Sequence, residues 1–339
     1  MKTLKYILFI LLIITIGVSV YIAVQPNDFK VTRTRTVAAP SQVIYNHIID
    51  VKKMESWLPW LEKDSETKLD LADSTSNIGA FYTWKSNNHS GSIKTLSTVP
   101  FQSINQELQF DKIETAQANW EFNQNNATDT EVSWTVSTDK LSFFEKANAL
   151  IHGGHEKMIG PDLERGLEKL NGDVITAMEV YSIKVDGIAQ HGGGYYIYTT
   201  TSSKISDIQT TINKVMPGVK DYAIKNNISM AGSPFITYHK WDEANNAVMF
   251  SCCIPTSTQT VTTQSDILTG QFEPFRAIKT TLKGNYSNLR EARDAGYNYI
   301  NQYNMEATET GPMLEVYLTD PSQKPNPANW ITEIYIAIN

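Results

Sequence analysis

The sequence predicts an α+β protein that has an N-terminal transmembrane helix followed by two antiparallel-sheet domains. Three observations lead to this prediction. An uninterrupted apolar run of 19 residues, Tyr6 to Val24, opens the chain. Short alternating segments between residues 30 and 138 are separated by Asn, Asp, Gly and Ser, which is typical of an antiparallel meander. The rest of the chain holds a near-duplication, in which a strand, a helix and a two-strand hairpin occur twice.

The apolar run predicts a retained membrane anchor within residues 1–28. At 1.5 Å per residue such a helix spans roughly 28 Å, close to the hydrocarbon thickness of a bilayer. The alternative is a cleaved signal peptide, whose apolar stretch is shorter and ends in small residues. Lys2 and Lys5 favour a cytoplasmic N-terminus, although three basic residues between positions 30 and 35 partly oppose it. We therefore expect a single-pass membrane protein whose soluble domains are extracytoplasmic.

Residues 29–172 are predicted to fold one antiparallel sheet around one helix. The first strand ends at Pro40, and Ser41 is placed to cap a short helix. The meander follows, and a helix from about Leu141 to Leu170 closes the domain. The opening "VAAPSQVIYNHIIDV", the "SWLPW" turn, the "GAFYTWKSNNHSGSIKTL" hairpin and the closing helix resemble the helix-grip superfamily of START, Bet v 1 and polyketide cyclase-like (SRPBCC) domains. The resemblance implies a cup with an interior cavity, and its members bind lipids, hormones or polyketides.

Residues 173–339 are predicted to form the duplicated domain, after Asn171-Gly172-Asp173 breaks the preceding helix. Two such halves predict a continuous antiparallel sheet, with helices on one face and a groove at the pseudo-twofold axis. "PMLEVYLTDP", "TEIYIAI" and the Gly284 and Tyr286 before the second helix resemble the GyrI-like effector-binding domain. That domain is a ligand module of some transcriptional regulators and of stand-alone small-molecule binders. No helix-turn-helix precedes it in this sequence, so a role at DNA does not follow.

Two Glu-aliphatic-Tyr segments are the main candidates for a ligand site. Side chains alternate along a strand, so Glu315 shares a face with Tyr317, and Glu333 shares a face with Tyr335. Because the intervening positions are aliphatic and suit a core, we expect the paired strands to gather both acids and both phenols on the other face. In GyrI-like pockets a glutamate flanked by aromatic residues commonly faces the ligand, and the resemblance assigns that part to these four residues. Such a surface favours a cationic or amphipathic organic molecule, and the alternative is a solvated sheet face.

The first half of the duplication carries different residues in the corresponding hairpin. We expect Tyr196, Tyr198, His239 and Trp241 to line the other side of the groove. For His239 the alternative is an ordinary surface or core position, because nothing nearby in the sequence requires a base.

Composition and missing motifs disfavour several other functions. A net charge of −7 and the lack of a Lys/Arg cluster argue against nucleic-acid binding. His152, His155 and His191 are not accompanied by the carboxylate or cysteine ligands of a metal site, so we expect no metal and no cofactor. The neighbouring Cys252 and Cys253 are interpreted as small buried residues.

The resulting hypothesis is a membrane-anchored protein that holds a small organic ligand for sensing or sequestration. One alternative is a hydrolase of electrophilic toxic molecules, in which a Glu beside a Tyr orients water and protonates a leaving group. Another is a non-catalytic interaction scaffold. Replacing Glu333 by Gln separates the first two hypotheses.

Overall fold

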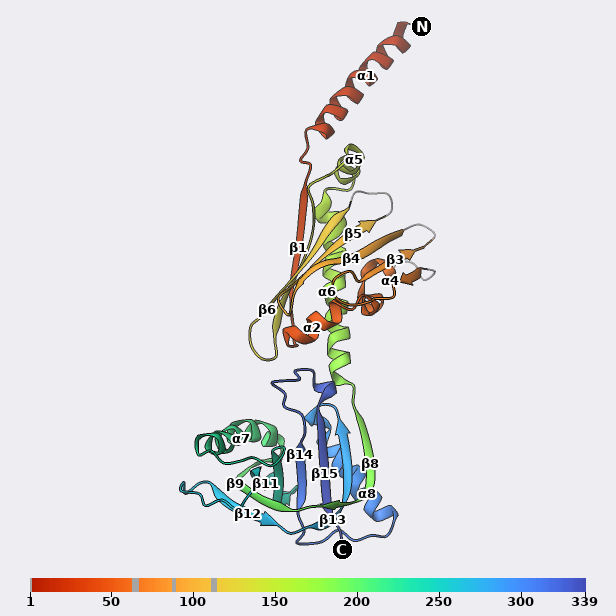
Figure 1. Ribbon diagram of the computed structural model, residues 1–339. Coiled ribbons are helices and arrows are strands. Elements are labelled where there is room, and N and C mark those ends of the chain that lie inside the picture. Colours follow the sequence, from red (N-terminus) through yellow and green to blue (C-terminus); the bar gives the residue numbers. More distant parts are fainter. Residues whose placement is uncertain (1, 63–66, 87–89, 111–114) are drawn as a thin grey trace. The chain divides into compact units, whose positions relative to one another are not determined.

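The computed structural model describes residues 2–62, 67–86, 90–110 and 115–339 (Figure 1). The chain divides into two compact units, and the division falls between Thr176 and Ala177. Within the described residues each unit contains one antiparallel sheet, of seven strands in the first and eight in the second, together with helices. The α+β class predicted from the sequence is confirmed.

In the first unit the sheet order is β1-β7-β6-β5-β4-β3-β2. Its strands are β1 (Phe29–Val37), β2 (Lys68–Leu71), β3 (Phe81–Lys85), β4 (Ser90–Val99), β5 (Ser103–Phe110), β6 (Ala116–Gln124) and β7 (Thr130–Thr138). Its helices are α1 (Lys2–Ala23), α2 (Ser41–Ile48), η1 (Val51–Lys53), α3 (Met54–Trp57), α4 (Pro59–Glu62), α5 (Phe143–Ile151) and α6 (His155–Glu179).

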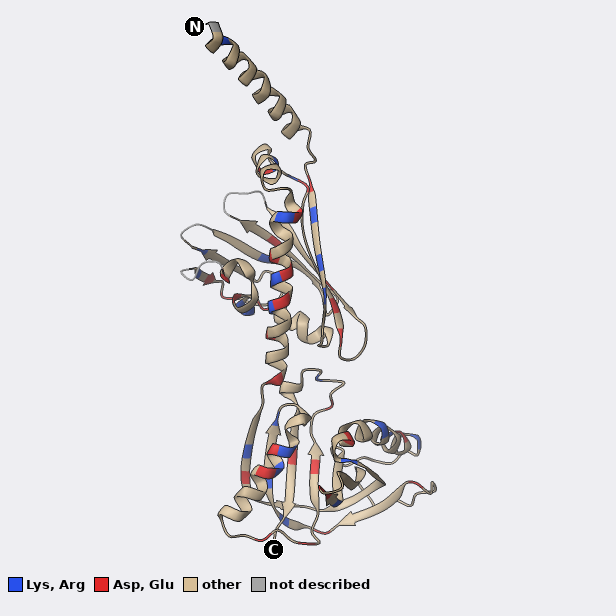
Figure 2. Ribbon diagram, turned by 180° about the vertical axis from the view of Figure 1, so that it is seen from behind, with Lys and Arg blue, Asp and Glu red and all other residues tan. Residues whose placement is uncertain are grey.

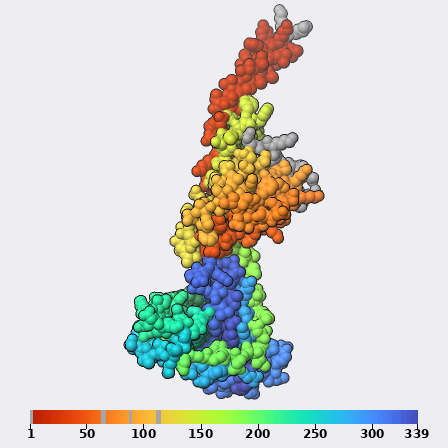
Figure 3. Space-filling model, in the orientation of Figure 1, coloured from red at the N-terminus to blue at the C-terminus, as the bar shows by residue number. Residues whose placement is uncertain are grey.

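Helix α1 is the apolar run expected at the N-terminus. Over Thr3–Ala23 its mean hydropathy is 2.6, and within the described residues it is the one helix long and apolar enough to cross a membrane. Its side chains are exposed, and over most of its length no other segment packs on it (Figure 3). A signal sequence has the same properties, so this helix by itself does not distinguish an anchor from a leader.

Helix α6 packs on the sheet of the first unit through small and apolar residues. At Gly166 an added Cβ would lie 2.6 Å from a ring carbon of Trp134, so this close approach requires glycine. The Trp134 ring stacks on Trp120 with centroids 4.4 Å apart, and both are almost fully buried. The tryptophans at these two positions are therefore core residues.

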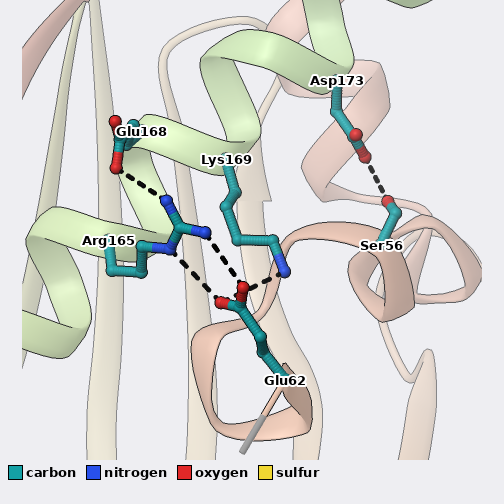
Figure 4. A network of polar contacts seen from close by, with 6 residues as sticks. All are labelled: Ser56, Glu62, Arg165, Glu168, Lys169 and Asp173. Carbon is teal, nitrogen blue, oxygen red and sulfur yellow. Dashed lines mark hydrogen bonds and ion pairs between the residues drawn. The ribbon is translucent and has the colours of Figure 1, made fainter.

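The expected helix break at Asn171-Gly172-Asp173 is wrong, since α6 continues to Glu179. Leu170 and Val174 are fully buried and extend the apolar stripe of the helix through this segment. Side chains of the preceding helices also hold it: Asp173 accepts a hydrogen bond from Ser56, and Arg165 contacts Glu62 at 2.9 Å (Figure 4). Tertiary contacts thus override the weak helix propensity of Asn, Gly and Asp.

The second unit has the sheet order β12-β9-β11-β10-β14-β15-β13-β8. Its strands are β8 (Ser182–His191), β9 (Gly194–Lys204), β10 (Phe235–Asp242), β11 (Ala247–Thr256), β12 (Leu268–Phe272), β13 (Phe275–Lys283), β14 (Met313–Tyr317) and β15 (Ile331–Ala337). Its helices are η2 (Ile205–Asp207), α7 (Ile208–Lys225), η3 (Tyr286–Asn288), α8 (Leu289–Gln302) and η4 (Pro327–Asn329).

The two halves of the second unit repeat the same order of elements. The first half is β9-α7-β10-β11 and the second is β13-α8-β14-β15, and they join where β10 pairs with β14. The sheet order is symmetric about this pairing, as the near-duplication predicts. The edge strand β12 was not predicted, and β8 begins at Ser182 because α6 occupies the residues expected to start it.

Both helices of the second unit pack on the same face of its sheet. Side chains of α7 and α8 share one core cluster with strand residues such as Ile236 and Ile334. We call this side the helix face. The opposite side, which carries Phe235, Cys253, Leu314 and the aromatic residues around them, is called the aromatic face.

Candidate functional site

The pairing of β14 with β15 places the two Glu-aliphatic-Tyr segments on opposite faces. Glu315 lies opposite Ile334, whereas Glu333 lies opposite Val316. Residues directly opposite each other on paired strands share a face. Glu315 and Tyr317 therefore lie on the helix face and Glu333 and Tyr335 on the aromatic face, so the expected gathering of all four on one surface is wrong.

Glu315 is completely buried and its carboxylate is surrounded by donors of the chain itself. Nη1 of Arg293, on α8, lies 2.6 Å from Oε1. The hydroxyls of Tyr238 and Tyr317 donate to Oε2 at 2.9 and 3.1 Å. Burial raises the pKa of both phenols, and the nearby Glu315 charge raises it further, so both remain donors.

The Arg293 guanidinium also lies against two neighbouring aromatic rings. Its carbon is 4.7 Å from the ring centre of Trp241 and 5.7 Å from that of Tyr238. Although burial disfavours its charge, Glu315 beside it leaves the pKa of Arg293 above its ordinary value. A carboxylate with aromatic walls is the arrangement expected for an organic cation, and here the chain's own Arg293 fills it.

Sequence reasoning missed Arg293 and Tyr238. A signal for the arginine was present, because Arg293 lies on the buried stripe of α8 together with Leu289, Gly296 and Ile300. A single cation on such a stripe requires a buried partner.

On the aromatic face, Glu333 is paired with both a cation and a phenol. Its Oε1 lies 2.6 Å from Nζ of Lys279, and its Oε2 accepts a hydrogen bond from the Tyr335 hydroxyl at 2.7 Å. The Glu333 side chain is 19% exposed, so solvent reaches this pair. Burial and the Glu333 carboxylate together raise the pKa of Tyr335.

A row of rings joins Tyr335 to the tyrosines of β9 across the aromatic face. Neighbouring ring centroids are 4.7 to 6.3 Å apart, which is the range for stacked and edge-to-face pairs. In order, the row is Tyr335, His191, Phe275, Phe272, Tyr196 and Tyr198. The structure thus brings Glu333, Tyr335, Tyr196 and Tyr198 onto one face.

The two remaining predicted residues, Trp241 and His239, lie in different environments. Trp241 packs on the core of the helix face, with its ring against the Arg293 guanidinium. His239 is exposed at the β-bulge of β10, and its Nε2 lies 2.7 Å from the hydroxyl of Ser251. Although the residue is exposed, its ring is partly desolvated, and this lowers the pKa of His239 and favours the neutral imidazole.

A groove of about 700 Å³ lies on the helix face of the second unit. Ile212 and Met216 of α7 form one wall, and Tyr286 and Tyr317 line the groove from the second half. Burial, with Asp320 nearby, raises the pKa of Tyr286 to about 12, so its phenol stays protonated. Tyr317 is the one predicted site residue in this lining, and its hydroxyl donates to Glu315.

The rim of this groove is charged. Hydrogen bonds from Ser322 lower the pKa of Asp320, which keeps this carboxylate ionised, and Lys220 lies 3.6 Å from it. An apolar floor with a polar rim is the usual composition of a small-molecule site.

The first unit holds a smaller cavity of about 210 Å³ between its sheet and α5 and α6. Trp60, Phe110 and Leu163 are among its apolar lining residues, and Glu145 and Asn148 of α5 also line it. No three His, Cys, Asp or Glu side chains gather as metal ligands among the residues that the structure describes.

Residues 194–339 match the family described as the GyrI-like small molecule binding domain. The C-terminal half of the chain therefore carries a GyrI-like domain. No curated protein sequence matches the chain.

Several solved structures are similar to the chain. The crystal structure of the EcmrR C-terminal domain is 17% identical and covers 47% of this chain and 98% of its own, with a TM-score of 0.40. The Zhui aromatase/cyclase from Streptomyces sp. R1128 is 16% identical and covers 45% of this chain and 97% of its own, with a TM-score of 0.35.

Proposed function

We propose that this protein is a membrane-anchored binder that holds a small amphipathic organic molecule for sensing or sequestration. The observation that carries the proposal is the groove of about 700 Å³ in the GyrI-like domain. This volume lies within the range of about 300–1,000 Å³ for small-molecule sites. A scaffold with a filled sheet face would lack such an opening.

The charges around the groove favour an amphipathic ligand. Both predicted acids are already compensated, Glu315 by Arg293 and Glu333 by Lys279. The floor of the groove is aliphatic and aromatic, and its rim carries the Lys220–Asp320 pair. An apolar body would rest on the floor, with a polar or charged end at the rim.

Helix α1 is the proposed anchor. Between Tyr6 and Ala23 it carries no charged residue (Figure 2). Its length and mean hydropathy suit a bilayer span. We place the two sheet units outside the cytoplasm, and cysteine labelling of intact cells tests this placement.

Dye binding tests the groove. The full chain in detergent should bind a neutral environment-sensitive dye, and Met216→Trp, which fills the groove, should weaken binding by roughly tenfold or more. Lys214→Trp is the matched control, because Lys214 is exposed on the same helix and does not line the groove. If both variants and the wild type bind the dye with equal affinity, the dye does not bind in the groove and the proposal is wrong. Native mass spectrometry of the purified protein would reveal a molecule that copurifies with it.

The hydrolase alternative rests on the Glu333–Tyr335 pair and has its own test. Glu333 lies on the aromatic face, opposite the groove. The Glu333→Gln variant should therefore bind the dye with the affinity of the wild type, within about twofold, or 0.4 kcal/mol. Incubation of the wild type with epoxide or other electrophilic compounds should leave them intact. Turnover that Glu333→Gln abolishes would replace the binding proposal with the enzymatic one.

A further inference from the structure

Helix α5 has its apolar side turned to solvent. Phe144 and Ile151 are each 80% exposed, and Phe143 and Leu150 are 40% and 39% exposed. Spacings of one, seven and eight residues place these four side chains in one stripe along the helix.

The inward side of α5 is the more polar one. Lys146 and Ala149 are its buried residues, and Glu145 and Asn148 line the cavity of the first unit. A surface helix of a soluble protein normally has the reverse arrangement. Four large exposed apolar side chains on a nine-residue helix indicate an apolar environment outside the protein.

Direct contacts hold α5 at the end of α1. The Lys146 ammonium donates to the carbonyl oxygens of Gln25, at 2.7 Å, and Ala23, at 3.4 Å. The backbone N–H of Leu141, just before α5, donates to the carbonyl of Asn27 at 2.7 Å. In the space-filling view the yellow-green residues of α5 stand beside the last part of α1 (Figure 3).

We propose that α5 is an interfacial membrane helix whose stripe Phe143, Phe144, Leu150 and Ile151 enters the lipid bilayer beside the end of the α1 span. The inference rests on the proposed membrane anchor. If α1 crosses the bilayer, its C-terminal end at Ala23 lies near the interface, and Lys146 fixes α5 at that depth. Amphipathic helices bind this layer by burying large apolar side chains. Lipid is therefore the occupant that the position of the stripe favours.

Site-specific fluorescence quenching tests the proposal with the full chain in phosphatidylcholine nanodiscs. Ile151→Cys and, separately, Phe144→Cys carry an environment-sensitive label, and quenching is measured with brominated acyl chains. Ile14→Cys in α1 is the positive control, and Ile78→Cys, whose parent side chain is 65% exposed in the first unit, is the matched exposed control. Native cysteines give no background, because Cys252 and Cys253 are fully buried and burial raises the pKa of Cys252 to about 12.

The inference predicts that labels at 14, 144 and 151 lose most of their emission in brominated nanodiscs, while the label at 78 does not. If the label at position 14 is quenched and the labels at positions 144 and 151 are not, the proposal of an interfacial helix is wrong, while that of the membrane anchor stands. No quenching at 14 would overturn both. A blue-shifted but unquenched label at 151 would indicate that a protein surface covers the stripe, and would also overturn the proposal.

Discussion

At the scale of single residues, the most informative pair is Glu315 with Arg293. Both are buried, and their separation of 2.6 Å together with two phenol hydroxyls saturates the carboxylate. A buried pair of this kind adds little net stability, but removal of one partner leaves an uncompensated charge.

Arg293→Met should lower the free energy of unfolding by about 3–5 kcal/mol, because Glu315 then stays buried without a cation. Denaturant titration of the full chain measures this loss. Arg290→Met is the matched control on the same helix. Arg290 is 69% exposed and faces Glu243, which is 65% exposed, so its loss should cost at most about 1 kcal/mol.

The double variant Arg293→Met with Glu315→Gln removes both charges and should recover part of the loss. If Arg293→Met and Arg290→Met lower the free energy of unfolding equally, the prediction that Glu315 needs a buried cation is wrong.

The sequence predicts which side chains alternate but not which face they occupy. Leu314 is 1% exposed and Glu315 is not exposed at all, so both faces of β14 are covered at this point. The prediction assumed that the acidic face avoids the core. Arg293 makes burial of Glu315 possible, because it supplies a cation for the carboxylate. It lies on a helix, 22 residues before Glu315 in the sequence. A pairing of this kind is not visible in the local pattern of a strand.

At the scale of elements, α6 shows how packing extends a helix beyond its propensity. Its buried stripe passes through the expected break, and its glycines have different environments. An added Cβ at Gly166 would crowd Trp134 and Pro59, whereas an added Cβ at Gly172 would have nothing within 4 Å.

Gly172→Ala should stabilise the protein by about 0.5–1 kcal/mol, because alanine favours the helical backbone and meets no neighbour. Gly166→Ala should destabilise it by about 1–3 kcal/mol through overpacking against Trp134. Thermal unfolding followed by circular dichroism compares the two. A neutral or destabilising Gly172→Ala would mean that the helix breaks there after all.

At the scale of the whole molecule, the order of the elements follows from the sequence more closely than the sites do. The two sheets, the apolar N-terminal helix and the repeated β-α-β-β order can all be predicted from alternation, turn residues and duplication. The ion pairs, the ring row and the groove depend on contacts between distant segments, which the sequence pattern does not encode.

Stability should fall as the pH is lowered from about 7.5 to 5. Burial lowers the pKa of His47, assisted by Lys53 and opposed by Asp173, and burial also lowers the pKa of His155 and His191. These histidines fold in the neutral form, so their contribution is complete above about pH 6.5 and is lost as the unfolded chain gains protons below that value. Thermal midpoints measured across this range test the direction.

His47→Gln should reduce this pH dependence, because it removes one of the buried groups. His152→Gln is the control, since His152 is exposed. A midpoint that rises on acidification would contradict the assignment of neutral folded histidines.

Helix α5 has one side on the cavity of the first unit and the other in the proposed lipid layer. An apolar molecule that leaves this cavity past α5 would then enter lipid without crossing water. Its rate of exchange would depend on partition between cavity and bilayer rather than on aqueous solubility. Compounds too insoluble to reach a free protein would therefore still have access to this one.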